Sequence, residues 1–271
     1  MEATSEYYQN KVAVVTGGAS GIGLALAETM LSYGVKQTVL ADVNDENLKR
    51  ETARLNTAYG GKVLGLHCDV TKEEDVQGMI RKAAEFGGRI DILFNNAGAG
   101  LGGWFDKLTN EDWTKAFALN FYGALYGIRA VLPIMRKQGS GHIVDVISGI
   151  AFVPMAGQTM YAATKAALNG LTLALRYELW DENIRFTSAT PGVVDTPIWK
   201  TGGAEPPPGA QSPEQSAHTI LLGVAKNERL VLGDQGDVSA AKSCFNPDAA
   251  AAMEEYLLNV ARKRRRGEFV V

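Results

Sequence analysis

Three polar residues have types and spacing that suit proton transfer to or from a bound alcohol or carbonyl. Tyr161 and Lys165 are four positions apart, so on a helix their side chains share one face, with Cβ atoms about 5 to 6 Å apart. A free tyrosine has a pKa of about 10, and a neighbouring ammonium favours its phenolate, so Lys165 can activate Tyr161. Ser148 follows an apolar run typical of a strand, where its hydroxyl can hold a substrate oxygen while the proton moves. The structural alternative is a buried ring, a lysine stem that extends to solvent, and a serine that caps a helix.

The beginning of the chain predicts the elements that hold a phosphate-bearing ligand near these groups. Residues 11–16 are typical of a buried strand, a glycine-rich turn follows, and an amphipathic helix pattern continues to about Tyr33. Gly17 allows a tight exit from the strand, Gly21 lets backbone N–H groups approach a pyrophosphate, and Gly23 lets the helix pack closely on the sheet. The unpaired N–H groups of the helix start then face the phosphates. Glycines also form turns that bind nothing, so the motif depends on its surroundings.

An acidic residue ends the next expected strand. Residues 37–41 are apolar and Asp42 follows them, which completes a βαβ unit of about thirty residues. Its carboxylate can accept hydrogen bonds from both hydroxyls of an adenosine ribose and would repel a 2′-phosphate. Since no Arg or Lys stands beside Ser20, Ala41 or Val43 to receive that phosphate, the sequence predicts NAD as the cofactor and disfavours NADP.

The remaining chain alternates between strand and helix patterns. Further strands are expected at 62–67, 89–94, 142–147, 184–189 and 230–233, and helices at about 45–58, 72–86, 111–137, 159–180 and 213–225. This alternation predicts an α/β fold: one Rossmann-type, doubly wound parallel sheet of about seven strands, with right-handed crossovers and helices on both faces. Ligands bind at the carboxyl ends of such strands, and Asn96, Ser148, Tyr161 and Thr196 fall at or just beyond those ends.

Other polar residues lie near the carboxyl ends of the expected strands, and the sequence alone does not assign them a single role. Asp69 can accept a hydrogen bond from an adenine amino group, or Asp69 or Thr71 caps the following helix. Residues 95–100 are amide and small residues, which indicates close approach of backbone to a ligand or to a neighbouring strand. Asn120 lies inside a helical pattern, where Asn is mildly unfavourable, so a specific reason for it is expected.

Composition limits the class of protein. The 271 residues are 46% hydrophobic and have a net charge of −3, which supports one sizeable domain and argues against nucleic acid as a partner. The basic run at 262–266 is short and is interpreted as a solvated helix end. Cys68 and Cys244 have no paired spacing, and no secretory leader or membrane-spanning apolar stretch is evident, so we expect a soluble cytoplasmic protein. The three histidines, His67, His142 and His218, lie far apart, and no metal site is expected.

Six motifs occur together in one order. They are Thr16-Gly17-x-x-x-Gly21-x-Gly23, Asn95-Asn96-Ala97-Gly98, Asn120, Ser148, Tyr161-x-x-x-Lys165 and Pro191-Gly192. Over roughly residues 10–235 the chain resembles the short-chain dehydrogenase/reductase family of the classical type, in which these motifs occur in the same order and at similar intervals. One such motif would be weak evidence, whereas six in register are very specific.

The resemblance implies roles for individual residues. Tyr161 is expected to be the general acid/base, and Lys165 to lower its pKa and hold the nicotinamide ribose. Ser148 is expected to orient the substrate, and Asn120 to bind a water that links Lys165 to solvent. Asp145 departs from the family pattern, which more often has a polar amide there, and it has no evident role. The residues expected to bind the cofactor are Gly17, Ser20, Gly21, Ile22, Gly23, Asp42, Asp69, Val70, Asn96, Ala97, Gly98, Tyr161, Lys165, Pro191, Gly192, Val194 and Thr196.

The implied reaction is hydride transfer between NAD and a carbon that bears a secondary hydroxyl or carbonyl. Candidate pocket residues are mostly apolar or aromatic: Leu101, Trp104, Phe105, residues 150–160, Ile198, Trp199 and the proline-rich loop. They favour a hydrophobic, steroid-like, aryl or long-chain substrate over a sugar, although the same residues can be core. Two alternatives remain: an NAD(P)H-dependent ketoreductase that runs mainly toward the alcohol, and a dinucleotide-binding regulatory protein without turnover.

We expect three segments. Residues 1–10 are an N-terminal tail, residues 11–238 are the catalytic domain with a substrate lid at about 196–212, and residues 239–271 are a helical extension. In the extension, residues 247–265 predict an amphipathic helix with Met253, Leu257, Leu258 and Val260 on or near its apolar side. This helix is expected to cover the substrate cleft or a neighbouring subunit. The resemblance implies a homodimer or homotetramer formed through the two long helices.

Overall fold

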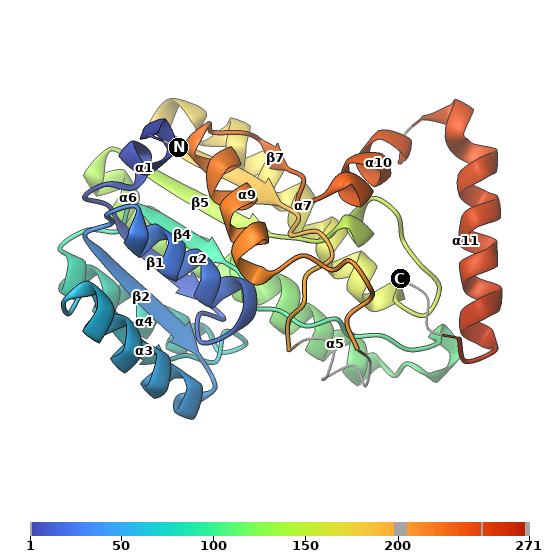
Figure 1. Cartoon of the computed structure of the whole chain (residues 1–271), viewed down its shortest axis with the longest axis horizontal. Helices are drawn as coiled ribbons and strands as arrows, with labels where there is room; N and C mark the ends of the chain where they lie inside the picture. Colours follow the sequence, from blue (N-terminus) through green and yellow to red (C-terminus); the bar gives the residue numbers. More distant parts are fainter. Residues whose placement is uncertain (1, 198–204, 245, 269–271) are drawn as a thin grey trace.

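The structure is a computed structural model that describes residues 2–197, 205–244 and 246–268. Its fold is built on a parallel sheet of seven strands (Figure 1). The strand order is β3-β2-β1-β4-β5-β6-β7, and every paired register is parallel. The strands are β1 (Val12–Thr16), β2 (Gln37–Asp42), β3 (Val63–His67), β4 (Ile92–Asn95), β5 (Gly141–Val146), β6 (Ile184–Ala189) and β7 (Leu230–Val231). The expected Rossmann-type α/β fold is therefore confirmed.

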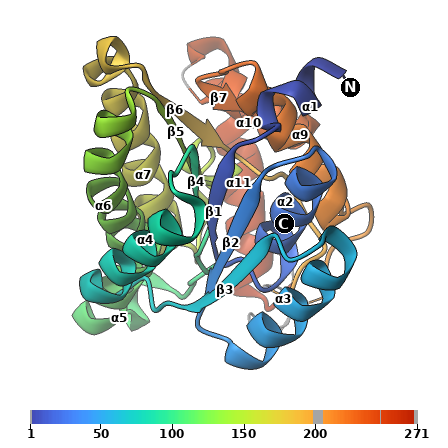
Figure 2. The same ribbon diagram turned by 90° about the vertical axis from the view of Figure 1, so that its left-hand side faces the viewer.

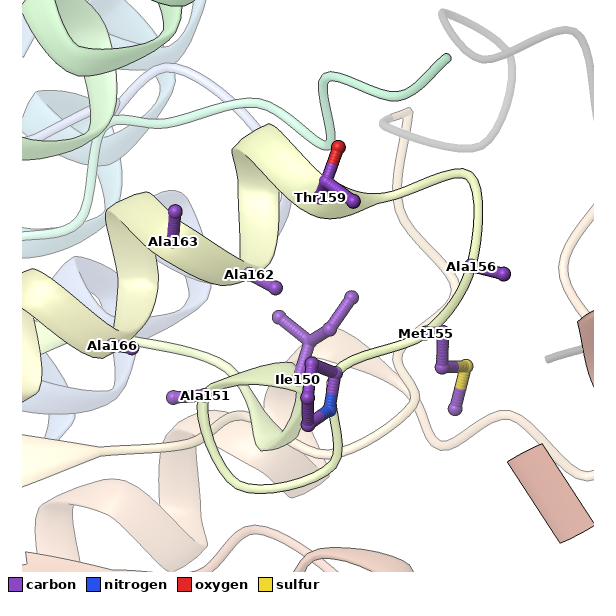
Figure 3. A pocket seen from close by; sticks show the side chains of 9 residues that line it. Ile150, Ala151, Met155, Ala156, Thr159, Ala162, Ala163 and Ala166 are labelled. Carbon is purple, nitrogen blue, oxygen red and sulfur yellow. The ribbon is translucent and has the colours of Figure 1, made fainter. Parts of the chain in front are cut away.

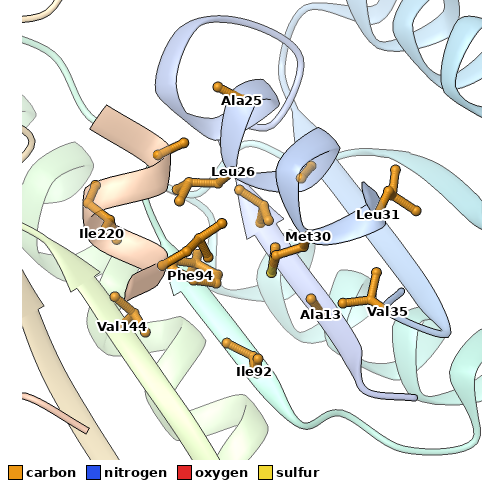
Figure 4. Packing of buried hydrophobic residues seen from close by; sticks show 14 of the residues in the cluster. Ala13, Ala25, Leu26, Met30, Leu31, Val35, Ile92, Phe94, Val144 and Ile220 are labelled. Atoms are coloured by element: carbon orange, nitrogen blue, oxygen red, sulfur yellow. The ribbon is translucent and has the colours of Figure 1, made fainter. Parts of the chain in front are cut away.

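Helices cover both faces of this sheet (Figure 2). One layer contains α2 (Gly21–Ser32), α3 (Asp45–Tyr59) and α9 (Pro213–Ala225), and the other contains α4 (Glu73–Gly87), α6 (Gly123–Gln138) and α7 (Thr159–Glu178). Because both faces are covered, the central strands are nearly continuous runs of buried residues, and all five residues of β1 are buried. Figure 4 shows how Leu26 and Met30 of α2 pack against Phe94 of β4 and Ile220 of α9. This packing fixes the glycine turn before α2 against the end of the sheet.

The helix expected over 111–137 is interrupted. Helix α5 (Asn110–Phe117) passes through a π-helical segment, η2 (Ala118–Tyr122), before α6 begins. A Cβ on Gly123 would lie 3.0 Å from the side chain of Val70, so the helix approaches the chain after β3 closely at the point where it resumes. A π-turn widens the helix and commonly marks a functional site. The expectation of one regular helix was wrong at Asn120.

Residues at the N-terminus fold onto the domain. The segment expected to be a tail contains helix α1 (Glu2–Tyr8). Tyr8 is fully buried, and its hydroxyl donates a 2.7 Å hydrogen bond to the carbonyl oxygen of Leu221 in α9. The aromatic ring supplies the apolar contact and its hydroxyl finds a partner, which is how a short helix without strong propensity is held. Tyr7 bonds through its hydroxyl to Nδ1 of His142 at 2.7 Å.

A helix that the sequence pattern did not predict crosses the expected boundary between residues 238 and 239. Helix α10 (Gln235–Ser243) follows β7, and a 3₁₀ turn, η5 (Pro247–Ala249), leads into α11 (Ala250–Arg265). Val260 is the buried residue of α11, whereas Leu258, expected near the apolar side, is 53% exposed. Figure 1 shows α11 standing away from the helices that cover the sheet.

One helical stretch has the length and composition of a membrane span, which corrects the expectation that no apolar stretch of the chain approaches that length. Asn110–Gln138 is 29 residues long with a mean hydropathy of 1.3 in its most apolar window. Within it, Ile128, Val131 and Met135 pack in the core formed with β4, β5 and α4. Core helices of soluble proteins reach the same length and hydropathy, so the packing of this stretch in the core explains its apolar composition.

Candidate active site

The glycine turn after β1 has the conformation that its sequence predicts. Gly17 and Gly21 have φ angles of 64° and 51°, which favour glycine. A Cβ on Gly23 would lie 2.1 Å from the carbonyl oxygen of Gly17, so only glycine fits where the first turn of α2 contacts this loop. Ser20 is the N-cap residue of α2, and its side chain makes no capping hydrogen bond. Its hydroxyl and the N–H groups of the first turn, including that of Ile22, are therefore suited to an anion.

Asp42 connects the end of β2 to this turn. One carboxylate oxygen accepts a hydrogen bond from the Ala19 N–H at 3.0 Å, and the other accepts one from the Asn44 N–H at 3.0 Å. The carboxylate is partly exposed and lies beside the phosphate-binding turn. Each oxygen keeps a lone pair for a further donor. The geometry fits the ribose contact expected from the sequence.

Asn96 joins β4 to β1 below the turn. Its Nδ2 donates to the carbonyl oxygens of Thr16 at 2.9 Å and Gly17 at 3.3 Å, and its N–H donates to the hydroxyl of Thr16 at 3.0 Å. The N–H of Ala97 donates to the same hydroxyl at 3.1 Å. The segment expected to approach a ligand or a neighbouring strand closely thus holds the ends of β4 and β1 together. The next residue, Gly98, has no room for a side chain, because a Cβ there would lie 2.8 Å from Oδ1 of Asn120.

The polar residues after β3 stabilise their own turn. The carboxylate of Asp69 accepts from the hydroxyl of Thr71 at 2.7 Å and from its N–H at 3.1 Å. These bonds, with the hydroxyl contact the stronger, hold the pKa of Asp69 below its usual value. Neither residue is the N-cap of α4, since that position is Lys72, so the capping interpretation was wrong. Val70 is buried beside Gly123.

Ser148 and Tyr161 come together from different elements. Ser148 lies two residues beyond the end of β5, and Tyr161 lies in the first turn of α7. Burial has the largest effect on the pKa of Tyr161 and raises it, a hydrogen bond from Ser148 lowers it, and the carboxylate of Asp237 raises it further. In the protein alone the phenol is therefore protonated at neutral pH, and the lowering expected from Lys165 does not outweigh burial. The two hydroxyls form a pair that can bind one oxygen atom.

Lys165 is buried below this pair. Its side chain is on the same face of α7 as Tyr161, with Nζ 5.9 Å from the centre of the tyrosine ring. The ammonium donates to the carbonyl oxygen of Val146 at 2.8 Å. Burial lowers the pKa of Lys165 to about 8, and Asp145 opposes that shift. The spacing prediction of a shared helix face is confirmed.

The π-helical segment brings Asn120 to the same place. Its Oδ1 accepts from the N–H of Ala99 at 2.9 Å, and its Nδ2 donates to the carbonyl oxygen of Ala99 at 3.0 Å and to Oγ1 of Thr164 at 3.3 Å. The hydroxyl of Thr164 donates to the carbonyl oxygen of Tyr161 at 2.8 Å. Asn120 therefore links the segment after β4 to the first turns of α7.

The loop after β6 lies next to the glycine turn. The N–H of Gly192 donates to Asp237 at 2.9 Å, and the N–H of Val193 donates to Asp234 at 2.8 Å, so the start of α10 holds this loop. A Cβ on Gly21 would lie 3.3 Å from Thr196, which places Thr196 next to the glycine turn. Pro191 accepts from the hydroxyl of Ser216 and from Nε2 of Gln211, while Val194 is buried and forms a bridge to Gln211.

Sequence reasoning missed three residues at this site. Thr164 could have been found, because it lies one turn after Tyr161 on the same helix face. Asp234 carries the local signal of a helix N-cap, because its carboxylate accepts from the N–H of Asp237 at 2.7 Å. The contacts of Asp234 and Asp237 with the loop after β6 carry no local signal, since they reach residues more than forty positions away. Asp145 was seen but had no interpretation.

An apolar cavity of about 410 Å³ lies beside the loop after Ser148 (Figure 3). Six of its wall residues belong to the expected pocket range 150–160: Ile150, Ala151, Pro154, Met155, Ala156 and Thr159. The wall continues along one face of α7 with Ala162, Ala163 and Ala166. Ser148 and Tyr161 are not among these residues, so the cavity adjoins the reacting groups without containing them. Leu101 and Trp104 are partly buried, and Phe105 is 70% exposed. Ile198, Trp199 and part of the proline-rich loop lie outside the described residues.

The last turn of α11 contacts the two loops that flank this region. Nη1 of Arg264 donates to the carbonyl oxygen of Ala156 at 2.9 Å and to Oε1 of Gln158 at 3.2 Å. The guanidinium of Arg265 stacks 4.0 Å above the ring of Trp104. The N–H of Gly103 also donates to the carbonyl oxygen of Gly157 at 2.8 Å. The extension, the loop after β4 and the loop after β5 therefore form one connected rim.

The remaining candidate groups are structural in the described part of the chain. His142 is buried between Tyr7 and Thr187, and burial lowers its pKa to about 3. Cys68 and Cys244 are free thiols. Among the residues that the structure describes, no group of His, Cys, Asp and Glu side chains could hold a metal ion.

Comparison with known proteins identifies the family of the chain. The family model for the short chain dehydrogenases matches residues 11–206. An uncharacterized oxidoreductase of Staphylococcus saprophyticus is 40% identical over 190 residues, which are 70% of this chain and 81% of that protein. The chain belongs to the short-chain dehydrogenase/reductase family, and it is an oxidoreductase of that family.

Solved structures of the family superpose on most of the chain. A short-chain dehydrogenase/reductase from Burkholderia phymatum in complex with NAD has a TM-score of 0.81 and 28% identity, covering 90% of this chain and 95% of that one. A 7α-hydroxysteroid dehydrogenase in complex with NADH and 7-oxo glycochenodeoxycholic acid has a TM-score of 0.77 and 26% identity, covering 84% of this chain and 94% of that one.

Proposed function

We propose that the protein is an NAD-dependent oxidoreductase that interconverts a secondary alcohol and a ketone on a hydrophobic substrate. The observation that carries this proposal is the meeting of Ser148, Tyr161 and Lys165 at the carboxyl end of the sheet. Such an edge is where open α/β sheets bind ligands. A regulatory protein without turnover would not require this buried ammonium beneath a paired phenol and hydroxyl.

The residues present fit a dinucleotide. The uncapped start of α2 and the positive φ angles of the turn suit a pyrophosphate, and Asp42 suits the adenosine ribose. Asp69, Asn96, Gly192 and the other members of the expected set surround the same edge. When bound, the nicotinamide supplies or accepts the hydride. Asp42 would repel a 2′-phosphate, so NAD is the proposed form.

The chain's own residues then handle the substrate oxygen and its proton. Ser148 and Tyr161 bind the oxygen, and Tyr161 donates its proton to a ketone or receives one from an alcohol. The ammonium of Lys165 stabilises the phenolate that remains after donation. Burial raises the pKa of Tyr161, so the protein alone holds the proton-donating form from which the second candidate, a ketoreductase, would start.

The rim supports an apolar substrate. Ile150, Phe152 and Val153 follow Ser148 closely and are buried, and the partly buried ring of Trp104 stacks under the guanidinium of Arg265. The steroid in the similar 7α-hydroxysteroid dehydrogenase structure agrees with a polycyclic ligand. Aryl and long-chain alcohols belong to the same class. We propose that residues 11–238 are the catalytic domain with a substrate lid at about 196–212, of which residues 198–204 lie outside the described part of the chain. The extension 239–271 is proposed to cover the cleft or a neighbouring subunit.

The proposed assembly is a homodimer or homotetramer in the cytoplasm. Tyr122 is 44% exposed at the junction of α5 and α6, and Trp180 is 39% exposed after α7, so apolar surface remains beside both long helices. Free cysteines agree with a reducing compartment. Light scattering of the purified protein tests the assembly, and a monomer at micromolar concentration would refute it.

The test of function is absorbance at the NADH wavelength with a panel of steroid, aryl, long-chain and sugar alcohols and ketones, in both directions, with NAD(H) and NADP(H). Tyr161→Phe should lower kcat by about 10²- to 10⁴-fold. Tyr177→Phe is the matched control, because Tyr177 lies on the same helix and is 62% exposed. NADH binding without turnover of any substrate in the panel would favour the regulatory protein, and rates for a sugar ten times those for the apolar alcohols would refute the substrate class.

A further inference from the structure

Asp145 is a carboxyl group in the centre of the sheet, directly below the reacting residues. It lies in β5, is fully buried, and is in register with Asn95 of β4 and Ser188 of β6. Its Oδ1 accepts from Nδ2 of Asn95 at 2.7 Å. The next residue, Val146, supplies the carbonyl that binds Lys165. A carboxyl group that is buried in a strand requires a compensating charge or a bound proton.

The second oxygen of Asp145 has an unusual partner. The hydroxyl of Thr172 lies 2.7 Å from Oδ2 and also 2.7 Å from the carbonyl oxygen of Leu168. A hydroxyl has one proton, so when Thr172 donates to Leu168, the contact with Asp145 is satisfied only if the carboxyl itself carries a proton. When Asp145 is ionised, Thr172 donates to it instead. The site therefore accommodates both charge states.

The charged group that acts on Asp145 is Lys165, and the charged group that acts on Lys165 is Asp145. From β4 and β6 the neighbours of Asp145 are the uncharged Asn95 and Ser188, and from α7 its direct contact is the uncharged Thr172. Tyr161 is the titratable group above Lys165, and Asp237 of α10 acts on Tyr161. Helix α7 contacts this part of β5 twice: Thr172 bonds Asp145, and Lys165 bonds the carbonyl of Val146, the next residue. The two charges therefore lie in one buried layer between β5 and α7, where each acts on the other.

We propose that Asp145 is a positioning residue whose ionised carboxylate keeps Lys165 in its ammonium form beneath Tyr161. This inference rests on the proposed function for its catalytic consequence, though not for the coupling itself. Burial lowers the pKa of Lys165 to about 8, and burial raises that of Asp145 to about 6, so both charges coexist between these values. Removing the carboxylate leaves the ammonium with burial alone, and it then loses its proton at lower pH.

Asp145→Asn isolates the charge from the hydrogen bonds. An asparagine can accept from Asn95 through its oxygen and donate through its nitrogen to Thr172, which then donates to Leu168. Asp91→Asn is the matched control, because Asp91 is also a buried aspartate, 7% exposed, and it lies just before β4, at the amino end of the sheet opposite to the site. Tm is measured for each variant.

The direct measurement is the titration of Lys165 by carbon NMR of protein labelled at lysine Cε, with the resonance assigned from Lys165→Met. In Asp145→Asn the midpoint should fall by about one pH unit, and in Asp91→Asn it should not move. In a turnover assay, the alkaline limb of kcat/KM should move by the same amount, while rates at pH 6 stay within about twofold. An unchanged Lys165 midpoint in Asp145→Asn overturns the inference, whatever happens to Tm.

Reciprocity supplies a second test that does not need Asp145→Asn to fold. Because coupling between two sites is mutual, Lys165→Met should raise the midpoint of Asp145, followed by its carboxyl carbon resonance. No change there contradicts the inference. If no variant or wild type turns over any substrate, the proposed function fails, while the two NMR titrations still decide the coupling.

Discussion

Replacing the carboxylate at the end of β2 should change which dinucleotide is bound. In Asp42→Asn the side chain keeps its size and one carbonyl oxygen, but it loses the negative charge. That charge now lies beside the glycine turn, fixed by hydrogen bonds of 3.0 Å from Ala19 and Asn44. A 2′-phosphate on the adenosine ribose would come close to this fixed charge, whereas the two free hydroxyls of NAD donate to it.

The size of the effect follows from the charges. Two unit charges 4 Å apart interact by about 1 kcal/mol in bulk water and about 4 kcal/mol at an effective dielectric constant of 20. The Asp42 carboxylate is partly exposed, so the lower figure is appropriate, and a phosphate monoester carries about 1.5 to 2 charges. The repulsion removed is then about 2 kcal/mol, which corresponds to a change of about 30-fold in the NAD-to-NADP ratio.

The assay is the dissociation constant of NADH and of NADPH by fluorescence, since it needs no substrate. We expect NADH to bind more weakly and NADPH more tightly in Asp42→Asn. Asp45→Asn, an exposed acid three residues further on, is the control and should leave the ratio unchanged. A loosened turn would weaken both nucleotides equally, so the ratio separates repulsion from damage. A ratio within threefold of wild type in Asp42→Asn would refute the assignment of Asp42.

Three further predictions concern packing, pH and the extension. Gly23→Ala places a methyl 2.1 Å from the carbonyl of Gly17, so NADH affinity should fall at least tenfold with a lower Tm. Gly170→Ala, which lies inside α7 and meets nothing within 4 Å, should leave NADH affinity unchanged and should not lower Tm. Burial lowers the pKa of His142 to about 3, so as the pH falls below about 6.5 the unfolded chain binds a proton at this residue before the folded protein does. Up to about 1.4 kcal/mol of the free energy of unfolding is then lost per pH unit, down to about pH 3. Urea unfolding at several pH values measures this loss, and an equal pH dependence of the free energy of unfolding in wild type and His142→Asn would contradict the prediction. Arg264→Ala removes the contacts with the loop at 156–158, so KM for an apolar substrate should rise several-fold with little change in kcat, whereas Arg266→Ala, which pairs with Glu268, should leave KM unchanged.

The sequence predicted the sheet because the strands are short apolar runs separated by helices, and a parallel sheet with two covered faces requires such runs. It predicted the cofactor turn for a similar reason, since three glycines and an acid at fixed intervals have few other physical explanations. Tyr161 and Lys165 were found because helix geometry converts a spacing of four into a shared face. Each of these signals is local.

Features that depend on distant contacts were not predicted. Helix α1 depends on a hydrogen bond from Tyr8 to a residue 213 positions away, and Asp237 reaches Gly192 across 45 positions. Helix α10 has little amphipathic pattern, because its role is to hold a loop rather than to cover the sheet. The charge state of Tyr161 depends on burial, which a spacing argument does not contain.

Asn120 shows how a weak local signal and a tertiary contact combine. Asparagine within a helix is mildly unfavourable, and here the helix widens into a π-turn at that residue, which is 1% exposed. In the widened turn the side-chain amide of Asn120 forms hydrogen bonds with the N–H and the carbonyl of Ala99 and with the hydroxyl of Thr164. These bonds hold the loop after β4 at a fixed separation from α7. The helical irregularity therefore supports the geometry on which the proposed proton transfer depends, because Thr164 is bonded in turn to the backbone of Tyr161.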